Sequence, residues 1–129
     1  MIQLLAQGCI LIAAGWLAWV ALISLVTPQI ARRGLASMGS TPTIQFAEHI
    51  PRAAIGIAII VRAAESKAPI AFTVGGWFLI ATSIAIMLAP REWHHAYAKW
   101  WAERIPLWFY RLAALPTIAF AGLLAYACL

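Results

Sequence analysis

The sequence predicts an all-α membrane protein. Four transmembrane helices are expected as a tandem repeat of two helical hairpins, with an amphipathic interfacial helix before the fourth. Hydrophobic residues make up 64% of the 129 residues and charged residues only 10%, whereas a soluble domain carries roughly 25% charged residues. Four apolar stretches approach the roughly 20 helical residues that cross a bilayer. We therefore expect a single transmembrane domain, residues 1–129, surrounded mostly by lipid.

The first span is expected at residues 3–27, since no charged side chain occurs in this stretch. The apolar run is longer than a signal-peptide core of about 7–15 residues, so we expect it to stay as a mature helix. Thr27-Pro28 is a natural helix end. Residues 29–42, which contain two glycines and end at Pro42, are expected to form a short loop.

The second span is expected at about residues 44–65. Only nine uncharged residues separate Arg52 from Arg62, which is about 14 Å at 1.5 Å per residue. The helix must therefore extend beyond both arginines, with one or both side chains snorkelling to the interface. Pro51 is expected to bend this helix or to mark its first turn.

The third and fourth spans are better defined. Residues 69–89 carry no charge, follow a tight turn at Lys67-Ala68-Pro69 and end at Pro90. Residues 107–128 form the fourth span, in which Pro116 predicts a kink.

The segment 91–104 between these two spans has an amphipathic helical pattern. Its acidic residues, together with His95 and Lys99, fall on one helical face, while its aromatic residues fall on another. This pattern is typical of a helix that lies in the headgroup layer with its aromatic side toward the lipid. The expected membrane-interface residues are Trp93, Tyr97, Lys99, Trp100, Trp101 and Arg104.

The two halves of the chain share an ordered set of Gly and Pro landmarks, which favours an internal duplication. Each half would contribute two spans, so both halves would enter the membrane from the same side, related by an axis along the membrane normal. The landmarks are Gly15-Trp16, Pro28, Pro42, Pro51 and Gly56 in the first half and Gly76-Trp77, Pro90, Pro106, Pro116 and Gly122 in the second.

The Lys and Arg distribution predicts the orientation, because cytoplasmic loops are enriched in these residues. Only Arg62 and Lys67 belong to the loop after the second span. The loops after the first and third spans, with the adjoining helix ends, hold Arg32, Arg33, Arg52, Arg91, Lys99, Arg104 and Arg111. Seven cations against two predict that both termini lie outside and the two longer loops lie in the cytoplasm.

A polar group near the inner end of the second span is the candidate binding site. Glu48 and Arg52 are four residues apart, a spacing that allows a charge pair on one helix face, and His49 adjoins them. Arg111 occupies the corresponding position of the fourth span, so these four residues could gather at the cytoplasmic mouth of the bundle. A charge pair that only fixes helix ends at the interface is the competing interpretation.

The sequence indicates no catalytic, metal or cofactor site. No acidic residue lies at the middle of a span, and no serine or cysteine nucleophile lies near a base in the sequence. His94 and His95 are adjacent, so their side chains point about 100° apart on a helix and would rarely share one metal. The scattered cations also argue against nucleic-acid binding, which favours clustered ones.

The run from Gly76 to Tyr126 resembles uncharacterised small bacterial inner-membrane proteins. The resemblance depends on the Pro90-Arg91-Glu92-Trp93 junction, which ends an apolar helix, and on a glycine-containing helix that re-enters the membrane. It covers the second half of the chain and implies a bacterial inner-membrane location. It assigns no residue roles.

Two function classes follow from these observations. The favoured one is a non-enzymatic accessory, assembly or lipid-contacting component of the inner membrane. Its partners would be membrane lipids and other membrane-protein subunits or a second copy of the chain. The alternative is a small transporter or channel, as a monomer or a dimer, with the polar group at its cytoplasmic mouth. A wet cavity at the middle of the membrane would favour transport, and a dry apolar core would favour the accessory class.

Overall fold

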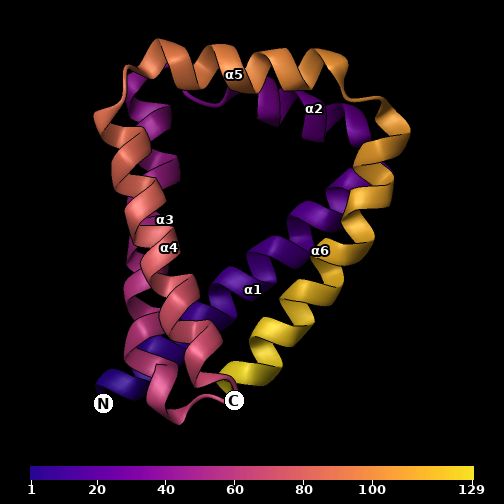
Figure 1. Cartoon of the computed structure of the whole chain (residues 1–129). Helices are drawn as coiled ribbons and strands as arrows, with labels where there is room; N and C mark the ends of the chain where they lie inside the picture. The colour runs from indigo at the N-terminus through magenta and orange to yellow at the C-terminus, as the bar shows by residue number, and fades with distance from the viewer.

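The computed structural model describes residues 1–129, and all of its regular structure is helical (Figure 1). Four helices are long and apolar enough to cross a membrane, as the sequence predicted. The elements are α1 (Ile2–Val26), α2 (Pro28–Ser37), α3 (Pro42–Arg62), the 3-10 turn η1 (Ala63–Glu65), α4 (Pro69–Leu88), α5 (Arg91–Arg104) and α6 (Leu107–Cys128).

The loop predicted at residues 29–42 is wrong for most of its length, because α2 occupies it. Pro28 stands at the first turn of α2, where its fixed φ favours a helix and its missing N–H costs nothing. The helix packs against α5, and this tertiary contact supports a ten-residue helix that would be marginal alone. Only the linker 38–41 remains non-helical.

The long helices form two pairs that meet at one end of the molecule and diverge toward the other. α3 packs along α4, and α1 packs along α6. The pairs come together where both chain termini and the turn between α3 and α4 lie, and α1 contacts α3 there (Figure 1). We call this the terminal end. At the opposite end α5 crosses from one pair to the other with α2 against it, and we call these two helices the α2/α5 layer.

The terminal end holds the apolar core. Seven buried residues from α1, α3, η1, α4 and α6 form it: Ala6, Ile10, Ala58, Ile59, Ala63, Phe72 and Cys128. The unpaired carbonyls at the C-terminus of α6 accept hydrogen bonds from Arg62 Nε (2.9 Å, to Cys128 O) and from Lys67 Nζ (3.0 Å, to Tyr126 O). Cations at a helix C-terminus also complement its dipole. The bundle is therefore closed at this end by apolar packing and by these hydrogen bonds.

α3 and α4 approach each other closely at two glycines. A Cβ atom added to Gly56 would lie 2.8 Å from the carbonyl oxygen of Gly76, and one added to Gly76 would lie 2.7 Å from that of Gly56. Only glycine fits at such a backbone contact, which is the usual way in which membrane helices pack tightly. This contact holds α3 in place against α4, and α3 provides part of the candidate site.

Candidate functional site

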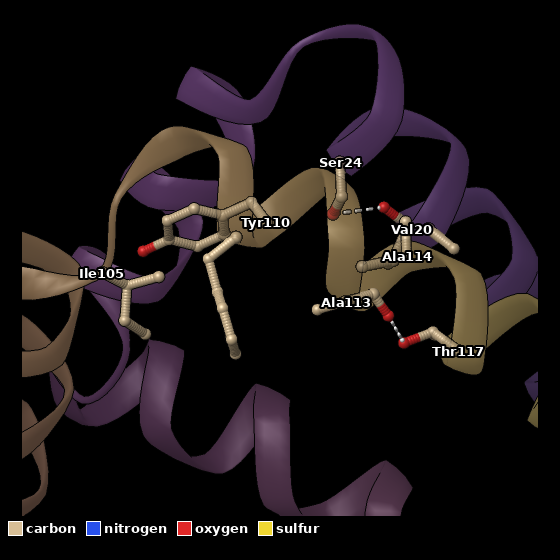
Figure 2. Close-up of a pocket in the computed structure, with 9 residues that line it drawn as sticks. Val20, Ser24, Ile105, Tyr110, Ala113, Ala114 and Thr117 are labelled. Carbon is tan, nitrogen blue, oxygen red and sulfur yellow. Dashed lines mark hydrogen bonds between the residues drawn. The ribbon is translucent and has the colours of Figure 1, made fainter.

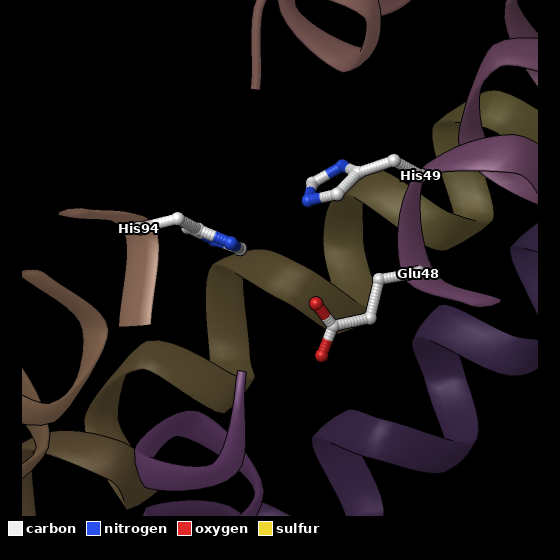
Figure 3. A group of neighbouring side chains, drawn as sticks. All are labelled: Glu48, His49 and His94. Carbon is white, nitrogen blue, oxygen red and sulfur yellow. The ribbon is translucent and has the colours of Figure 1, made fainter. Parts of the chain in front are cut away.

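Three chemically active side chains come together where α3 meets α5. Glu48 and His49 belong to α3 and His94 belongs to α5, and one donor atom from each lies within 4.8 Å of the other two. The imidazole rings of His49 and His94 are 5.2 Å apart between centroids. Figure 3 shows the two rings pointing toward one another, with the Glu48 carboxylate beside them. We call these three residues the Glu–His–His cluster.

The start of α3 places its members of the cluster on a protein-facing side. Thr41 caps the helix, since its hydroxyl accepts a hydrogen bond from the Ile44 backbone N–H at 3.1 Å. Gln45 and His49 are four residues apart and are only 3% and 5% exposed. The helical period thus buries a polar stripe in the first two turns of α3.

The linker between α2 and α3 holds the start of α5 in place. Arg91 Nη1 donates hydrogen bonds to the carbonyls of Gly39 (2.9 Å) and Ser40 (2.8 Å). The His95 ring bonds the carbonyl of Met38 at 2.9 Å. With Arg91 and His95 both turned to the linker, the adjacent His94 is left to face α3.

A hydrogen-bond chain orients His94. The Gln45 amide nitrogen donates to the Ile86 carbonyl of α4 at 3.3 Å, and this leaves the amide oxygen toward His94 Nδ1, also at 3.3 Å. An amide oxygen only accepts, so Nδ1 must carry the proton in this contact. The lone pair of the neutral His94 ring is therefore on Nε2.

The surroundings of His94 favour this neutral form. Burial lowers the pKa of His94 below its ordinary value of 6.5, and the neighbouring charges of His95 and Arg52 lower it further. Each of these effects opposes a second proton on the ring. His94 is therefore a neutral imidazole at pH 7.

The other two cluster members have buried polar atoms without partners. Neither ring nitrogen of His49 makes a hydrogen bond, and Glu48 Oε2 also makes none. Leaving a buried donor or acceptor unpaired costs about 1–3 kcal/mol. Native proteins rarely leave a side chain such as His49, which is 5% exposed, with both of its polar atoms unpaired.

Neither of the two arginines expected in this site belongs to the cluster. No salt bridge joins Glu48 to Arg52, because Arg52 Nη2 donates to Thr82 Oγ1 of α4 at 2.9 Å. Arg111 is exposed on α6, which belongs to the other helix pair (Figure 1). The structure thus brings together Glu48 and His49 of the predicted group and replaces both arginines with His94.

The predicted interface residues all lie on α5, which has three faces rather than two. Ala98 and Ala102 are buried and form, with His94, the stripe that faces the protein. The aromatic face is exposed, and Trp93, for example, is 72% exposed. Arg104 lies over the Trp100 ring at 4.0 Å, Tyr97 and Trp101 contact edge to face, and Lys99 is exposed.

A separate cavity of about 200 Å³ lies between α1 and α6, next to the α2/α5 layer (Figure 2). Two of its three hydroxyl groups are engaged, since Ser24 bonds the Val20 carbonyl at 2.9 Å and Thr117 bonds the Ala113 carbonyl at 2.8 Å. Arg32 flanks the cavity, bonding the Ile105 carbonyl at 2.7 Å with its guanidinium 5.8 Å from the centre of the Tyr110 ring. The lining residues are Val20, Ala21, Ser24, Ile105, Phe109, Tyr110, Ala113, Ala114 and Thr117.

Comparison with known proteins adds no identification, since no family model, curated protein or solved structure matches the chain.

Three residues of this region could not be assigned from the sequence. They are His94 as a partner of α3, Gln45, which holds the His94 ring in place, and Gly39, which lies beneath that ring. Their signals are present but indirect. Gln45 lies four residues before His49, on the same helical face. Gly39 is recognisable from the sequence only as a turn former. The contact between His94 and Gln45 spans 49 residues and depends on the fold.

Proposed function

We propose that this small integral membrane protein is a non-enzymatic, lipid-contacting accessory component of the bacterial inner membrane. The main support for this proposal is the cavity between α1 and α6. Its lining is mostly apolar, and it holds no ionisable side chain apart from the Tyr110 phenol. An acyl chain matches such a lining, and the adjacent Arg32 supplies a cation at the level expected for a lipid phosphate.

The placement of Arg32 supports an anionic headgroup. Its Nε and the Tyr110 hydroxyl are both without hydrogen-bond partners, so each has a donor to offer. A phosphate oxygen accepts from guanidinium strongly because both groups are charged. The lipid would thus lie between α1 and α6, with its headgroup at Arg32 of α2.

The proposal also includes the orientation of the protein in the membrane and an internal duplication of the chain. We place the α2/α5 layer on the cytoplasmic side, because seven of the nine Lys and Arg residues lie in or beside that layer. The order of the elements supports the duplication, since a long helix, a short helix and a second long helix occur twice in succession.

Native mass spectrometry of the purified protein tests the lipid proposal. Arg32→Gln should retain less phosphatidylglycerol than the wild type, with little change for phosphatidylcholine. Ala113→Phe, which fills the cavity, should reduce retention of both lipids. Ala119→Phe lies on an exposed part of α6 outside the cavity and should leave retention unchanged. Equal retention by all four proteins would contradict the proposal.

A small transporter or channel is the second candidate function, and the buried polar stripe of α3 favours it. The buried residues of this stripe are Gln45 and His49, and the half-buried Arg52 extends it to about two turns of the span. The apolar core at the terminal end weighs against a continuous pathway. Proteoliposomes loaded with a pH-sensitive dye would test this candidate function. A proton flux in the wild type that falls in Glu48→Gln would support transport, whereas an absence of flux in the wild type would contradict it.

A further inference from the structure

The Glu–His–His cluster has the donor set of a transition-metal site. Two imidazoles and one carboxylate are the protein ligands of several zinc sites with one open position, and of non-haem iron sites. Hard cations such as Mg²⁺ and Ca²⁺ prefer oxygen ligands instead. The chemistry of the cluster therefore selects a divalent ion of the Zn²⁺ class.

The geometry is close to what such an ion needs. Bonds of about 2.0–2.1 Å in a tetrahedral arrangement put neighbouring ligand atoms about 3.4 Å apart. The three donor atoms already lie within 4.8 Å of one another, so closing around an ion requires side-chain movements on the order of 1 Å. Glu48 and His94 are only partly buried and have room for rotation about their side-chain bonds.

The unpartnered His49 is an independent indication of a ligand. The residue is only 5% exposed, both of its ring nitrogens are unpaired, and its ring points at His94 across the cluster (Figure 3). A metal bond to one ring nitrogen would offset part of the desolvation cost of burying this side chain. A metal bond to the unpaired Glu48 Oε2 would offset part of its desolvation cost in the same way.

His94 also has the hydrogen-bonded support that metal-binding histidines usually have. Such a histidine donates its other ring N–H to an oxygen acceptor, which fixes the tautomer and the ring orientation. Here the acceptor is the Gln45 amide oxygen, and Gln45 is itself fixed by the Ile86 carbonyl. His94 Nε2 is then the free donor atom.

The nearby cation does not prevent binding. Arg52 contributes positive charge to the region, but its guanidinium is directed to Thr82 on α4. The Glu48 carboxylate supplies the compensating negative charge inside the cluster. Because Gln45 is engaged with His94, a water molecule would take the fourth position.

We propose that Glu48, His49 and His94 bind one divalent transition-metal ion, which fastens the start of α5 to the start of α3. The proposal is independent of the lipid site, which involves α1, α2 and α6. Its structural consequence is that the metal would order the α2/α5 layer, since the linker 38–41 and His95 are held at the same junction.

Titration of the full-length, metal-free protein in detergent with Co²⁺ and Zn²⁺ tests the proposal. We expect one Co²⁺ per chain with visible absorption, displaced by Zn²⁺, and X-ray absorption of the Zn²⁺ form showing two imidazole ligands. His49→Ala and His94→Asn should weaken binding at least about 100-fold, and Gln45→Leu, which removes the support of His94, should weaken it about 10–100-fold.

His95→Asn is the matched control, since His95 adjoins His94 but bonds Met38. It should leave the stoichiometry and affinity unchanged. Zn²⁺ should also raise the Tm of the wild type and slow hydrogen exchange of α5, but not in His94→Asn, whose helical circular dichroism verifies folding. Absence of saturable binding by the wild type, or undiminished binding by folded His49→Ala, would refute the proposal.

Discussion

Gly39 has a backbone φ of 68° and is the only residue of the chain with a positive φ. A Cβ atom at this position would lie 2.9 Å from His94 Nδ1 and 3.1 Å from the His95 backbone nitrogen. The left-handed conformation alone costs about 1–2 kcal/mol for other residues. Both the backbone and the space therefore require glycine beneath the cluster.

Gly39→Ala should accordingly lower the stability of the protein by at least about 1–2 kcal/mol and weaken metal binding, because His94 must move. Thermal unfolding in detergent measures the first effect. Gly34→Ala is the control: nothing lies within 4 Å of its added Cβ, and alanine in the interior of a helix is favoured over glycine by roughly 0.5–1 kcal/mol. An equal loss of stability in both variants would contradict the assignment.

The stability of the metal-free protein should depend on pH through His94. Its pKa is lowered in the folded state, so the unfolded chain binds the proton more readily. Stability from this group is therefore fully present above about pH 6.5 and is lost as the pH falls below that value. Tm values at about pH 7.5 and about pH 5.5, on either side of this range, should differ less in His94→Asn than in the wild type when chelator is present.

The residues of the cluster show where sequence reasoning stops. Glu48 and His49 can be selected because they are polar residues within an apolar span, an uncommon and costly placement. The spacing of Glu48 and Arg52 predicts that they pair, but Thr82 on α4 accepts the Arg52 hydrogen bond instead. His94 cannot be assigned from the sequence, since its contact with α3 exists only after α5 has folded back over the bundle.

Among the elements, the α3–α4 pair depends on its two facing glycines. In Gly76→Ala the new methyl group would lie 2.7 Å from a backbone carbonyl, which cannot rotate away, and 2.6 Å from Ile60 Cγ1. We expect a loss of about 1–3 kcal/mol from this overpacking. Gly75→Ala, with nothing within 4 Å of its added Cβ, should be neutral or stabilising when unfolding is compared in detergent.

The aromatic face of α5 should contact lipid. Trp93, Trp100 and Trp101 are all exposed, and indole favours the headgroup region. With the other four of the seven tryptophans replaced by Phe, lipids brominated at shallow acyl positions should quench their fluorescence in reconstituted protein. If fluorescence is unaffected while the protein is reconstituted alone, these tryptophans form a docking surface for a protein partner instead.

The four spans could be predicted from the sequence because long apolar runs with few charges are typical of helices that cross a bilayer. α2 could not, since its ten residues include Pro28 and Gly34, which favour a turn when considered locally. Its helical state depends on packing against α5, which no local pattern indicates. The same packing uses a third, alanine-lined face of α5 in addition to its predicted aromatic and charged faces.

The molecule as a whole is asymmetric along its long axis. The terminal end is closed by an apolar core and by Arg62 and Lys67, both of which are bound to the last turn of α6. The opposite end contains the divergent helix pairs, the α1–α6 cavity and the Glu–His–His cluster. All candidate chemistry is thus concentrated beside the α2/α5 layer.

This asymmetry allows a specific prediction of the orientation of the protein in the membrane. The two cations of the terminal end already have intramolecular partners, including the salt bridge between Arg62 and Glu65. The cations beside the α2/α5 layer include exposed ones such as Arg33, Lys99 and Arg111, which are available to anionic lipid of the cytoplasmic leaflet. Both the number and the availability of positive charges therefore favour a cytoplasmic α2/α5 layer.

Accessibility of single cysteines in a variant without Cys9 and Cys128 tests the orientation. Ser37→Cys on α2 and Ala96→Cys on α5 should react with a membrane-impermeant maleimide only when the reagent reaches the cytoplasmic face. Ala64→Cys, in the turn after α3, should react from outside in intact cells. All three positions are exposed, so burial does not limit the reaction. Labelling of Ala64→Cys from the cytoplasmic face alone would invert the topology and move the metal cluster and the lipid cavity to the outer side.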